Sequence, residues 1–167
     1  MDLIDIRGEI NQHVRLLINN ANFRLGRCGD SRIRFTSDNM TLADSKGGAL
    51  LINSRRLFVF ECELRQDAYT LQLLISRGEK HNRERALKVY YDHRNTVELA
   101  WVYGIASNAV DRHNTRIYKI KLLEDSELQT NDYGERVNRA KGLVGERFNH
   151  FIQKDVPELE RLFGVLQ

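Results

Sequence analysis

The stretch that decides the fold runs from Leu57 to Ile75 and reads LFVFECELRQDAYTLQLLI. Alternate residues of a strand point to opposite faces of a sheet. The first half of this stretch places an apolar set on one face, which comprises Phe58, Phe60, Cys62 and Leu64. Residues 66–68 are short enough for a hairpin loop, and residues 69–75 repeat the alternation as a returning strand. The stretch therefore predicts two neighbouring antiparallel strands.

Further strands are predicted on both sides of this hairpin. Residues 32–35 alternate arginine with apolar side chains, and residues 49–52 form a short apolar run before a turn at residues 53–55. Residues 115–123 alternate apolar residues with lysine and are predicted as another strand. Residues 96–110 fit either a buried strand or a buried helix, because short apolar runs do not distinguish the two.

Three helical regions are predicted around these strands. Residues 3–21 carry apolar side chains at three- and four-residue spacing, and residues 79–93 show a similar stripe. In the last third, Asp132 and Glu135 make a capping box before a long helix, and Pro157 restarts a short terminal one. We therefore expect the α+β class, with an antiparallel sheet flanked by an N-terminal helix, a crossing helix and C-terminal helices.

Length and composition limit the organisation of the protein. The chain has 167 residues, of which 41% are hydrophobic and 29% charged, so residues 1–167 are predicted to form a single domain with its own core. No apolar run approaches the roughly 20 residues that a membrane span needs, and no secretory signal is recognised. Cys28 and Cys62 belong to no Cys-x-x-Cys pair, which favours a reducing compartment, so we expect a cytoplasmic protein.

Charge is spread unevenly along a chain whose net charge is +3. Basic residues outnumber acidic ones between residues 24 and 94, whereas acidic residues dominate from residue 124 onward. A strand that ends where a helix begins, with arginines nearby, predicts an anion site, because free N–H groups and guanidinium groups both bind phosphate. The residues expected to contact phosphate are Arg77, Lys80, Arg83, Arg85 and Lys88, with support from Arg32, Arg34 and Arg56. The alternative is a solvated helix face on which glutamates form ion pairs with these arginine and lysine side chains.

Two sets of acidic residues suggest metal chemistry as an alternative. Glu61 and Glu63 share a strand face about 7 Å apart, and such a pair could hold Mg²⁺. The alternative for this pair is a set of cross-strand ion pairs with arginine. Asp44 and Lys46 form the acid-x-Lys triplet that PD-(D/E)xK nucleases use, although here the triplet lies in a polar loop. The histidines have no ligand-like spacing and no nucleotide-binding glycine motif is present, so no metal site and no cofactor are predicted.

The order of several short motifs resembles the C-terminal region of a prokaryotic PD-(D/E)xK nuclease-superfamily group. The resemblance spans most of residues 24–163. It rests on residues 32–35, 56–61, 70–78 with Arg83 following, 117–119 and 155–159. In that group the nuclease motif lies in the preceding half of the chain. The resemblance therefore implies an accessory domain of a DNA-acting system, of the kind found in phage defence, and carries over no catalytic residue.

These observations favour a non-enzymatic accessory or binding subunit that contacts nucleic acid or a nucleic-acid-processing protein complex, and the resemblance implies a role in antiviral defence. One alternative is a compact metal-dependent nuclease that uses Glu61 and Glu63, or Asp44 and Lys46. Another is a protein-interaction module, such as an inhibitor or adaptor, whose acidic C-terminal helices dock a partner. The aromatic residues available to such a docking surface are Phe148, Phe151 and Phe163.

Overall fold

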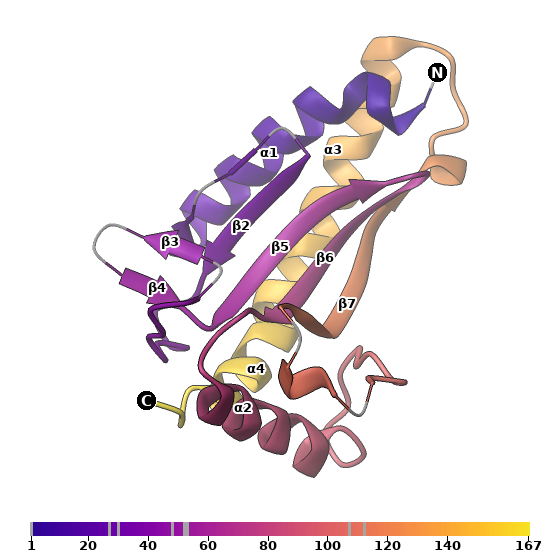
Figure 1. Ribbon diagram of the computed structural model, residues 1–167. Helices are drawn as coiled ribbons and strands as arrows, with labels where there is room; N and C mark the ends of the chain where they lie inside the picture. Colours follow the sequence, from indigo (N-terminus) through magenta and orange to yellow (C-terminus); the bar gives the residue numbers. More distant parts are fainter. Residues whose placement is uncertain are drawn as a thin grey trace.

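The computed structural model describes the whole chain except residues 1, 27, 30, 48, 52, 53, 107 and 112. The molecule has two layers, a twisted sheet and a set of helices that pack against one of its faces (Figure 1). The α+β class predicted from the sequence is confirmed. Part of the predicted turn at residues 53–55 lies outside the described residues.

The main sheet consists of antiparallel strands in the order β1-β2-β5-β6-β7. Their bounds are β1 Arg24–Leu25, β2 Arg32–Thr36, β5 Phe58–Arg65, β6 Ala68–Ile75 and β7 Thr115–Glu124. A separate hairpin of β3 (Ala49–Leu51) and β4 (Ser54–Arg56) projects beside the main sheet (Figure 1). The hairpin predicted at residues 57–75 is β5–β6, and its tight turn places Gln66 at a φ of 52°.

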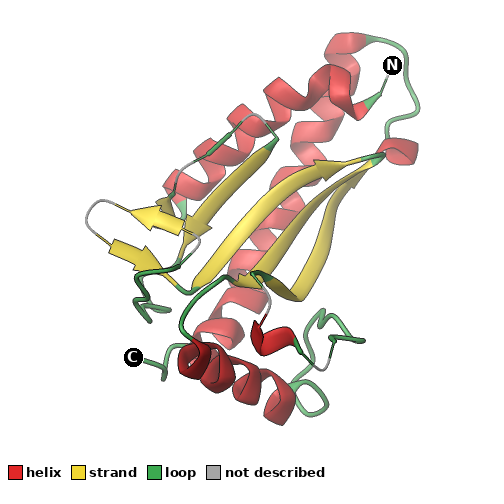
Figure 2. Cartoon of the chain, in the orientation of Figure 1, coloured by secondary structure: helices red, strands yellow, loops and turns green. Residues whose placement is uncertain are grey.

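The helices lie on one face of this sheet and at one of its ends (Figure 2). A 3-10 turn at Leu3–Ile6 leads into α1 (Arg7–Asn20), and α3 (Tyr133–His150) crosses the same face. A π-helical turn at Phe151–Asp155 joins α3 to α4 (Val156–Phe163), and α2 (Lys80–His93) closes the lower end. Two further 3-10 turns lie at Ala109–Asp111 and Asp125–Glu127. Among the described residues, no helix is both long and apolar enough to cross a lipid bilayer.

The core fills the space between the helices and the sheet face that they cover. The rings of Phe35 and Phe60 lie 5.2 Å apart, and Phe151 from the π turn meets Phe60 edge-on at 5.4 Å. Phe148 lies 5.5 Å from Phe151, and all four side chains are buried. Full burial of such a side chain contributes about 1.5–3 kcal/mol. One face of the sheet is thereby committed to the core.

Sequence periodicity misjudged two segments. Residues 96–110, predicted as strand or helix, run mostly without regular structure, and Trp101 pairs with Tyr118 of β7 through an isolated bridge. On α1 the buried stripe includes Ile18, whereas Leu17 is only half-buried. Half of the capping box predicted for α3 forms: the Glu135 backbone N–H donates to the Asp132 carboxylate at 2.7 Å, whereas the Asp132 backbone N–H donates to Thr130 Oγ1 at 3.3 Å.

Candidate nucleic-acid interface

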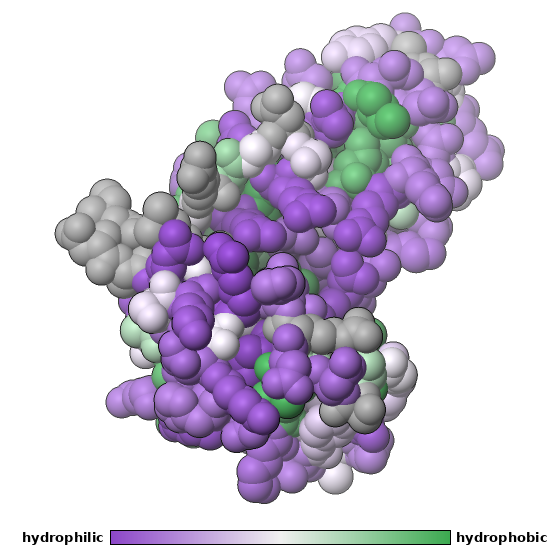
Figure 3. Space-filling model, in the orientation of Figure 1, coloured by the Kyte–Doolittle hydropathy of each residue, from purple (hydrophilic) through white to green (hydrophobic). Residues whose placement is uncertain are grey.

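The second face of the sheet carries no helix within the described part of the chain, and we call it the open face (Figure 1). Strand alternation sends charged residues of β2, β5 and β7 to this face. Its basic residues outnumber its three carboxylates, Glu61, Glu63 and Glu124, the last of which pairs with Lys121. The basic residues are Arg32, Arg34, Arg65, Arg116, Lys119 and Lys121. Hydrophilic residues accordingly cover the middle of the sheet in the space-filling view (Figure 3).

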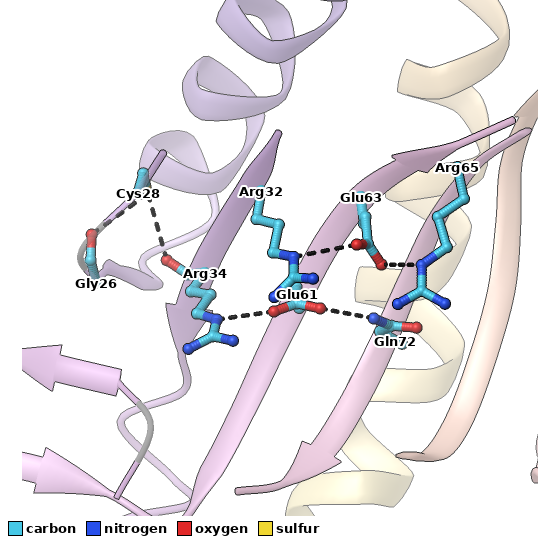
Figure 4. A network of polar contacts seen from close by, with 8 residues as sticks. All are labelled: Gly26, Cys28, Arg32, Arg34, Glu61, Glu63, Arg65 and Gln72. Atoms are coloured by element: carbon cyan, nitrogen blue, oxygen red, sulfur yellow. Dashed lines mark hydrogen bonds and ion pairs between the residues drawn. The ribbon is translucent and has the colours of Figure 1, made fainter. Parts of the chain in front are cut away.

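Glu61 and Glu63 are each held between side chains from neighbouring positions (Figure 4). Glu61 accepts a hydrogen bond from Arg34 Nε at 2.7 Å and another from Gln72 Nε2 at 2.7 Å. Glu63 accepts from Arg32 Nε at 3.0 Å and from Arg65 Nε at 2.7 Å. Both glutamates are almost fully buried beneath the longer side chains. The carboxylates therefore act as a floor that orients the basic side chains above them.

These contacts also leave net positive charge at the surface of the open face. Arg32 and Arg65 bond to Glu63 through Nε, and their side chains remain 47% and 57% exposed. Two guanidinium groups thus share one buried carboxylate. An arginine held in place by such a contact loses less conformational entropy when an anion binds, so these side chains are preorganised.

A groove with a volume of about 270 Å³ lies in this network. Its walls include Arg34, Arg65 and Arg116, and its floor includes Glu61 and Gln72. Gln72 is 1% exposed, and its Oε1 atom has no hydrogen-bond partner among the described residues. The Nε atom of Arg116 is likewise buried without a hydrogen-bond partner in the described part of the chain. The residues that line the groove therefore include one buried acceptor and one buried donor without partners among the described residues.

Arg83, the centre of the predicted phosphate site on α2, is a structural residue, and that prediction is wrong. Its side chain is 1% exposed. The guanidinium group donates to the carbonyl oxygens of Ile75 and Ala109 at 2.8 and 2.6 Å and to Thr115 Oγ1 at 2.6 Å. Burial lowers its pKa. Arg83 therefore ties α2 to the ends of β6 and β7 and is not available to a phosphate.

The N-terminus of α2 is already occupied by a carboxylate from the chain itself. Asp44 Oδ2 accepts from the Glu79 backbone N–H at 2.8 Å and from Asn82 Nδ2 at 3.0 Å. Burial opposes ionisation of Asp44, but the hydrogen bonds from Asn82 and the backbone of Lys46 and Glu79 outweigh burial and lower its pKa. Asp44 thus caps the helix at the point where the sequence predicted a free anion site.

The remaining residues of the predicted α2 cluster are dispersed over different contacts. Arg77 and Lys80 are exposed and line a separate open cavity of about 670 Å³ at the corner between β6 and α2. Lys88 pairs with Asp92 at 2.7 Å, one helical turn away. Arg85 points toward the backbone oxygen of Gln167 at 3.4 Å, and Arg56 donates to the backbone oxygen of Thr41. The structure therefore brings the predicted residues together in two places, Arg77 and Lys80 at this corner and Arg32 and Arg34 on the open face.

In both of the alternatives based on metal chemistry, the acidic residues are engaged in other contacts. Glu61 and Glu63 share a face, as expected, but each accepts hydrogen bonds from arginine, as in the cross-strand alternative. Asp44 lies in the loop before β3 and caps α2, while Lys46 pairs with Glu79 at 3.2 Å. The described residues contain no group of three or more His, Cys, Asp or Glu side chains placed to hold a metal ion.

The aromatic residues of the C-terminal helices are also committed to the core. Phe148, Phe151 and Phe163 are all 0% exposed. Phe163 packs against Phe58 of β5 with ring centroids 5.1 Å apart. A docking surface built from these three side chains is therefore excluded.

Two residues of the open face were missed by the sequence analysis, Arg116 and Gln72. Their signal was present in the alternation of β6 and β7, which places Gln72 opposite Glu61 and Arg116 opposite Leu74. The bulge between Leu73 and Leu74 shifts the register with β7, so sequence spacing alone did not align Arg116 with this face.

Comparison of the chain with protein-family models, with curated proteins and with solved structures finds no match. The resemblance to the nuclease-superfamily group therefore stays a prediction.

Proposed function

We propose that the protein is a non-enzymatic subunit that binds the phosphate backbone of a nucleic acid on the open face. The observation that carries the proposal is the set of arginines on an uncovered sheet face, two of which share the buried carboxylate of Glu63. Guanidinium groups match phosphate oxygens geometrically, and their contacts release the counterions that surround a nucleic acid.

The form of the open face suits an extended strand of nucleic acid. Basic side chains come from β2, β5 and β7, so they follow a path across the sheet rather than a single point. The modest net charge of +3 suits a subunit that binds together with a partner, since a dedicated nucleic-acid domain is usually more basic. In this proposal the protein acts as an accessory component of a nucleic-acid-processing complex, the role that the resemblance implies.

No catalytic step is assigned in this proposal. Glu61 and Glu63 are almost fully buried, and each already accepts hydrogen bonds from two neighbouring arginine or glutamine side chains. Their role is to orient the basic side chains that contact phosphate.

The test compares two double variants, each of which removes two positive charges. One variant changes the open face of the sheet, and the other changes the helical layer. Arg65→Gln with Arg116→Gln takes two cations from the open face, and Arg139→Gln with Arg161→Gln takes two exposed cations from α3 and α4. Binding of a single-stranded oligonucleotide is measured by fluorescence anisotropy at several salt concentrations. We expect the open-face variant to lower the slope of log affinity against log salt by about 1.4, because each phosphate contact on a single strand contributes about 0.7.

The matched variant on the helices should bind with the affinity and salt slope of the natural protein. If both double variants weaken binding equally, the interaction follows net charge alone and the open face is not the binding surface. If neither variant changes the binding, the proposed function is wrong.

A further inference from the structure

The Gln72 side chain is held so that its two polar atoms meet different surroundings. Its Nε2 donates to Glu61 at 2.7 Å, which fixes the orientation of the amide. Figure 4 shows the amide oxygen on the side away from Glu61. This oxygen is the buried acceptor without a partner among the described residues, and Gln72 lines the groove of the open face.

Arg116, from the neighbouring strand β7, brings the complementary group to the same groove. Its Nε is a buried donor for which the described residues supply no hydrogen-bond acceptor. A buried polar group without a partner is costly, so a ligand that satisfies it gains affinity. A hydroxyl group can donate to the glutamine oxygen and accept from the arginine Nε, whereas a C–H group at the same place can do neither.

The surroundings of these two atoms favour a hydroxyl that belongs to an anionic ligand. Arg34 and Arg65 also line the groove, and its volume of about 270 Å³ is small. Pockets for drug-sized ligands measure about 300–1,000 Å³, so this groove suits one sugar–phosphate unit of a strand. RNA carries a hydroxyl on every sugar next to its phosphates, and DNA lacks that group.

We propose that the groove over Gln72 and Arg116 reads the ribose 2′-hydroxyl, so that the protein binds RNA in preference to DNA. Once the side chains that cover these two buried atoms move aside, the hydroxyl donates to Gln72 Oε1 and accepts from Arg116 Nε, while the phosphates on either side contact the arginines of the open face. This inference rests on the proposed function, because it assigns the kind of nucleic acid that the open face binds.

The first experiment leaves the protein unchanged and varies the sugar. One mixed sequence is prepared as single-stranded RNA, as DNA and as 2′-O-methyl RNA, and the affinity for each is measured by fluorescence anisotropy at the same salt concentration. We expect RNA to bind roughly threefold to tenfold more tightly than 2′-O-methyl RNA, the effect of one neutral hydrogen bond, and to exceed DNA by more, because DNA also lacks the acceptor for Arg116 Nε. The 2′-O-methyl group keeps an acceptor oxygen but cannot donate to Gln72.

The second experiment locates the effect at Gln72. Gln72→Met should reduce the preference for RNA over 2′-O-methyl RNA to near parity while DNA binding persists, and Thr70→Val, two residues away on the same face, should keep that preference. Because Gln72→Met also removes a donor from Glu61, its fold is checked by circular dichroism. In the natural protein, the side-chain amide resonance of Gln72 should shift with RNA and stay in place with 2′-O-methyl RNA.

The two proposals fail in different ways. Equal affinity for all three strands, combined with a reduced salt slope in the Arg65 and Arg116 double variant, overturns the RNA preference and leaves the phosphate-binding function intact. An unchanged Gln72 amide resonance at saturating RNA likewise overturns the sugar contact. A double variant that binds like the natural protein overturns the phosphate-binding function itself.

Discussion

Arg83 and Arg65 show how the surroundings of a residue decide its role. Arg65 is mostly exposed and contacts one carboxylate, so its charge can reach a ligand. Arg83 is buried and donates to several backbone carbonyls, so its charge serves the fold. Counting arginines along the chain therefore says little about a binding surface until each side chain has been placed.

Replacement of Arg83 by methionine should destabilise the protein by about 3–5 kcal/mol, because it leaves buried carbonyl oxygens without donors. Urea denaturation followed by circular dichroism measures the loss. The neighbouring exposed Arg85, changed to methionine, should alter the stability by less than about 0.5 kcal/mol. A loss below about 1 kcal/mol for the Arg83 variant would contradict its structural role.

Glu127 makes the stability of the protein depend on acid pH. Bidentate hydrogen bonds from Arg147, at 2.7 and 2.5 Å, lower the pKa of Glu127 from 4.5 to about 2. A carboxylate with a depressed pKa in the folded state stabilises the fold above its unfolded pKa, and that stability is lost as the pH falls toward the folded value. We expect the natural protein to lose this contribution between pH 4.5 and about 2.

The measurement is the urea midpoint at a series of pH values for the natural protein and for Glu127→Gln. The variant cannot ionise at this position, so its midpoint should fall less steeply over the acid range. Parallel curves for the two proteins would show that the pair with Arg147 contributes nothing to the pH dependence.

The position of Arg83 could have been inferred from the sequence. Arg83, Ala86, Leu87 and Tyr90 follow the three- and four-residue spacing of a buried helical stripe. The charge of Arg83 led to its assignment to the exposed face. The hydrogen-bond acceptors of its guanidinium group come from the ends of β6 and β7 and from the turn at Ala109–Asp111. No local pattern in the sequence predicts these contacts.

At the scale of elements, local patterns predicted the regular structure well. The β5–β6 hairpin has the predicted facing of Phe58 and Phe60, and α3 begins after the predicted cap Asp132. The π-helical turn at Phe151–Asp155 and the capping of α2 by Asp44 were not predicted. Both depend on packing between segments distant in the chain, which short-range periodicity does not record.

Gly142 offers a test of helix α3 by itself. A Cβ atom added at this position meets no heavy atom within 4 Å, apart from the helix's own backbone and its chain neighbours. Alanine is favoured over glycine inside a helix by about 0.8–1 kcal/mol, so Gly142→Ala should raise the melting temperature by about 2–4 °C.

Gly47→Ala is the contrasting variant, because its Cβ would lie 2.3 Å from the Arg56 carbonyl oxygen. That contact is too close for the backbone to tolerate without a shift, so the melting temperature should fall. Differential scanning calorimetry measures both variants, and a lower melting temperature for Gly142→Ala would show that the helix is not free of contacts there.

At the scale of the whole molecule, Trp101 links elements that are distant in the chain. Its ring lies 5.6 Å from Tyr90 of α2 and 6.3 Å from Phe163 of α4, and its Nε1 donates to the Val97 carbonyl at 2.8 Å. Trp101 is the single tryptophan of the chain, so its fluorescence reports on the junction of these two helices alone.

If the sheet and all the helices unfold together, tryptophan fluorescence and far-ultraviolet circular dichroism should give the same urea midpoint. We expect coincidence, because the two layers share one hydrophobic core. A fluorescence transition at lower urea than the circular dichroism transition would show that the α2–α4 junction opens as a separate unit.

The segment around Trp101 also shields the sheet from other chains. Val102 donates to the Ile117 carbonyl and Lys119 donates to the Ala100 carbonyl, so part of the outer rim of β7 is already hydrogen-bonded. At the opposite rim, β1 is only two residues long. Long unpaired rims are templates for fibril growth, and charged side chains such as lysine discourage it. Because one edge strand is partly hydrogen-bonded and the other is very short, we expect the protein to resist edge-to-edge aggregation although one face of its sheet is uncovered.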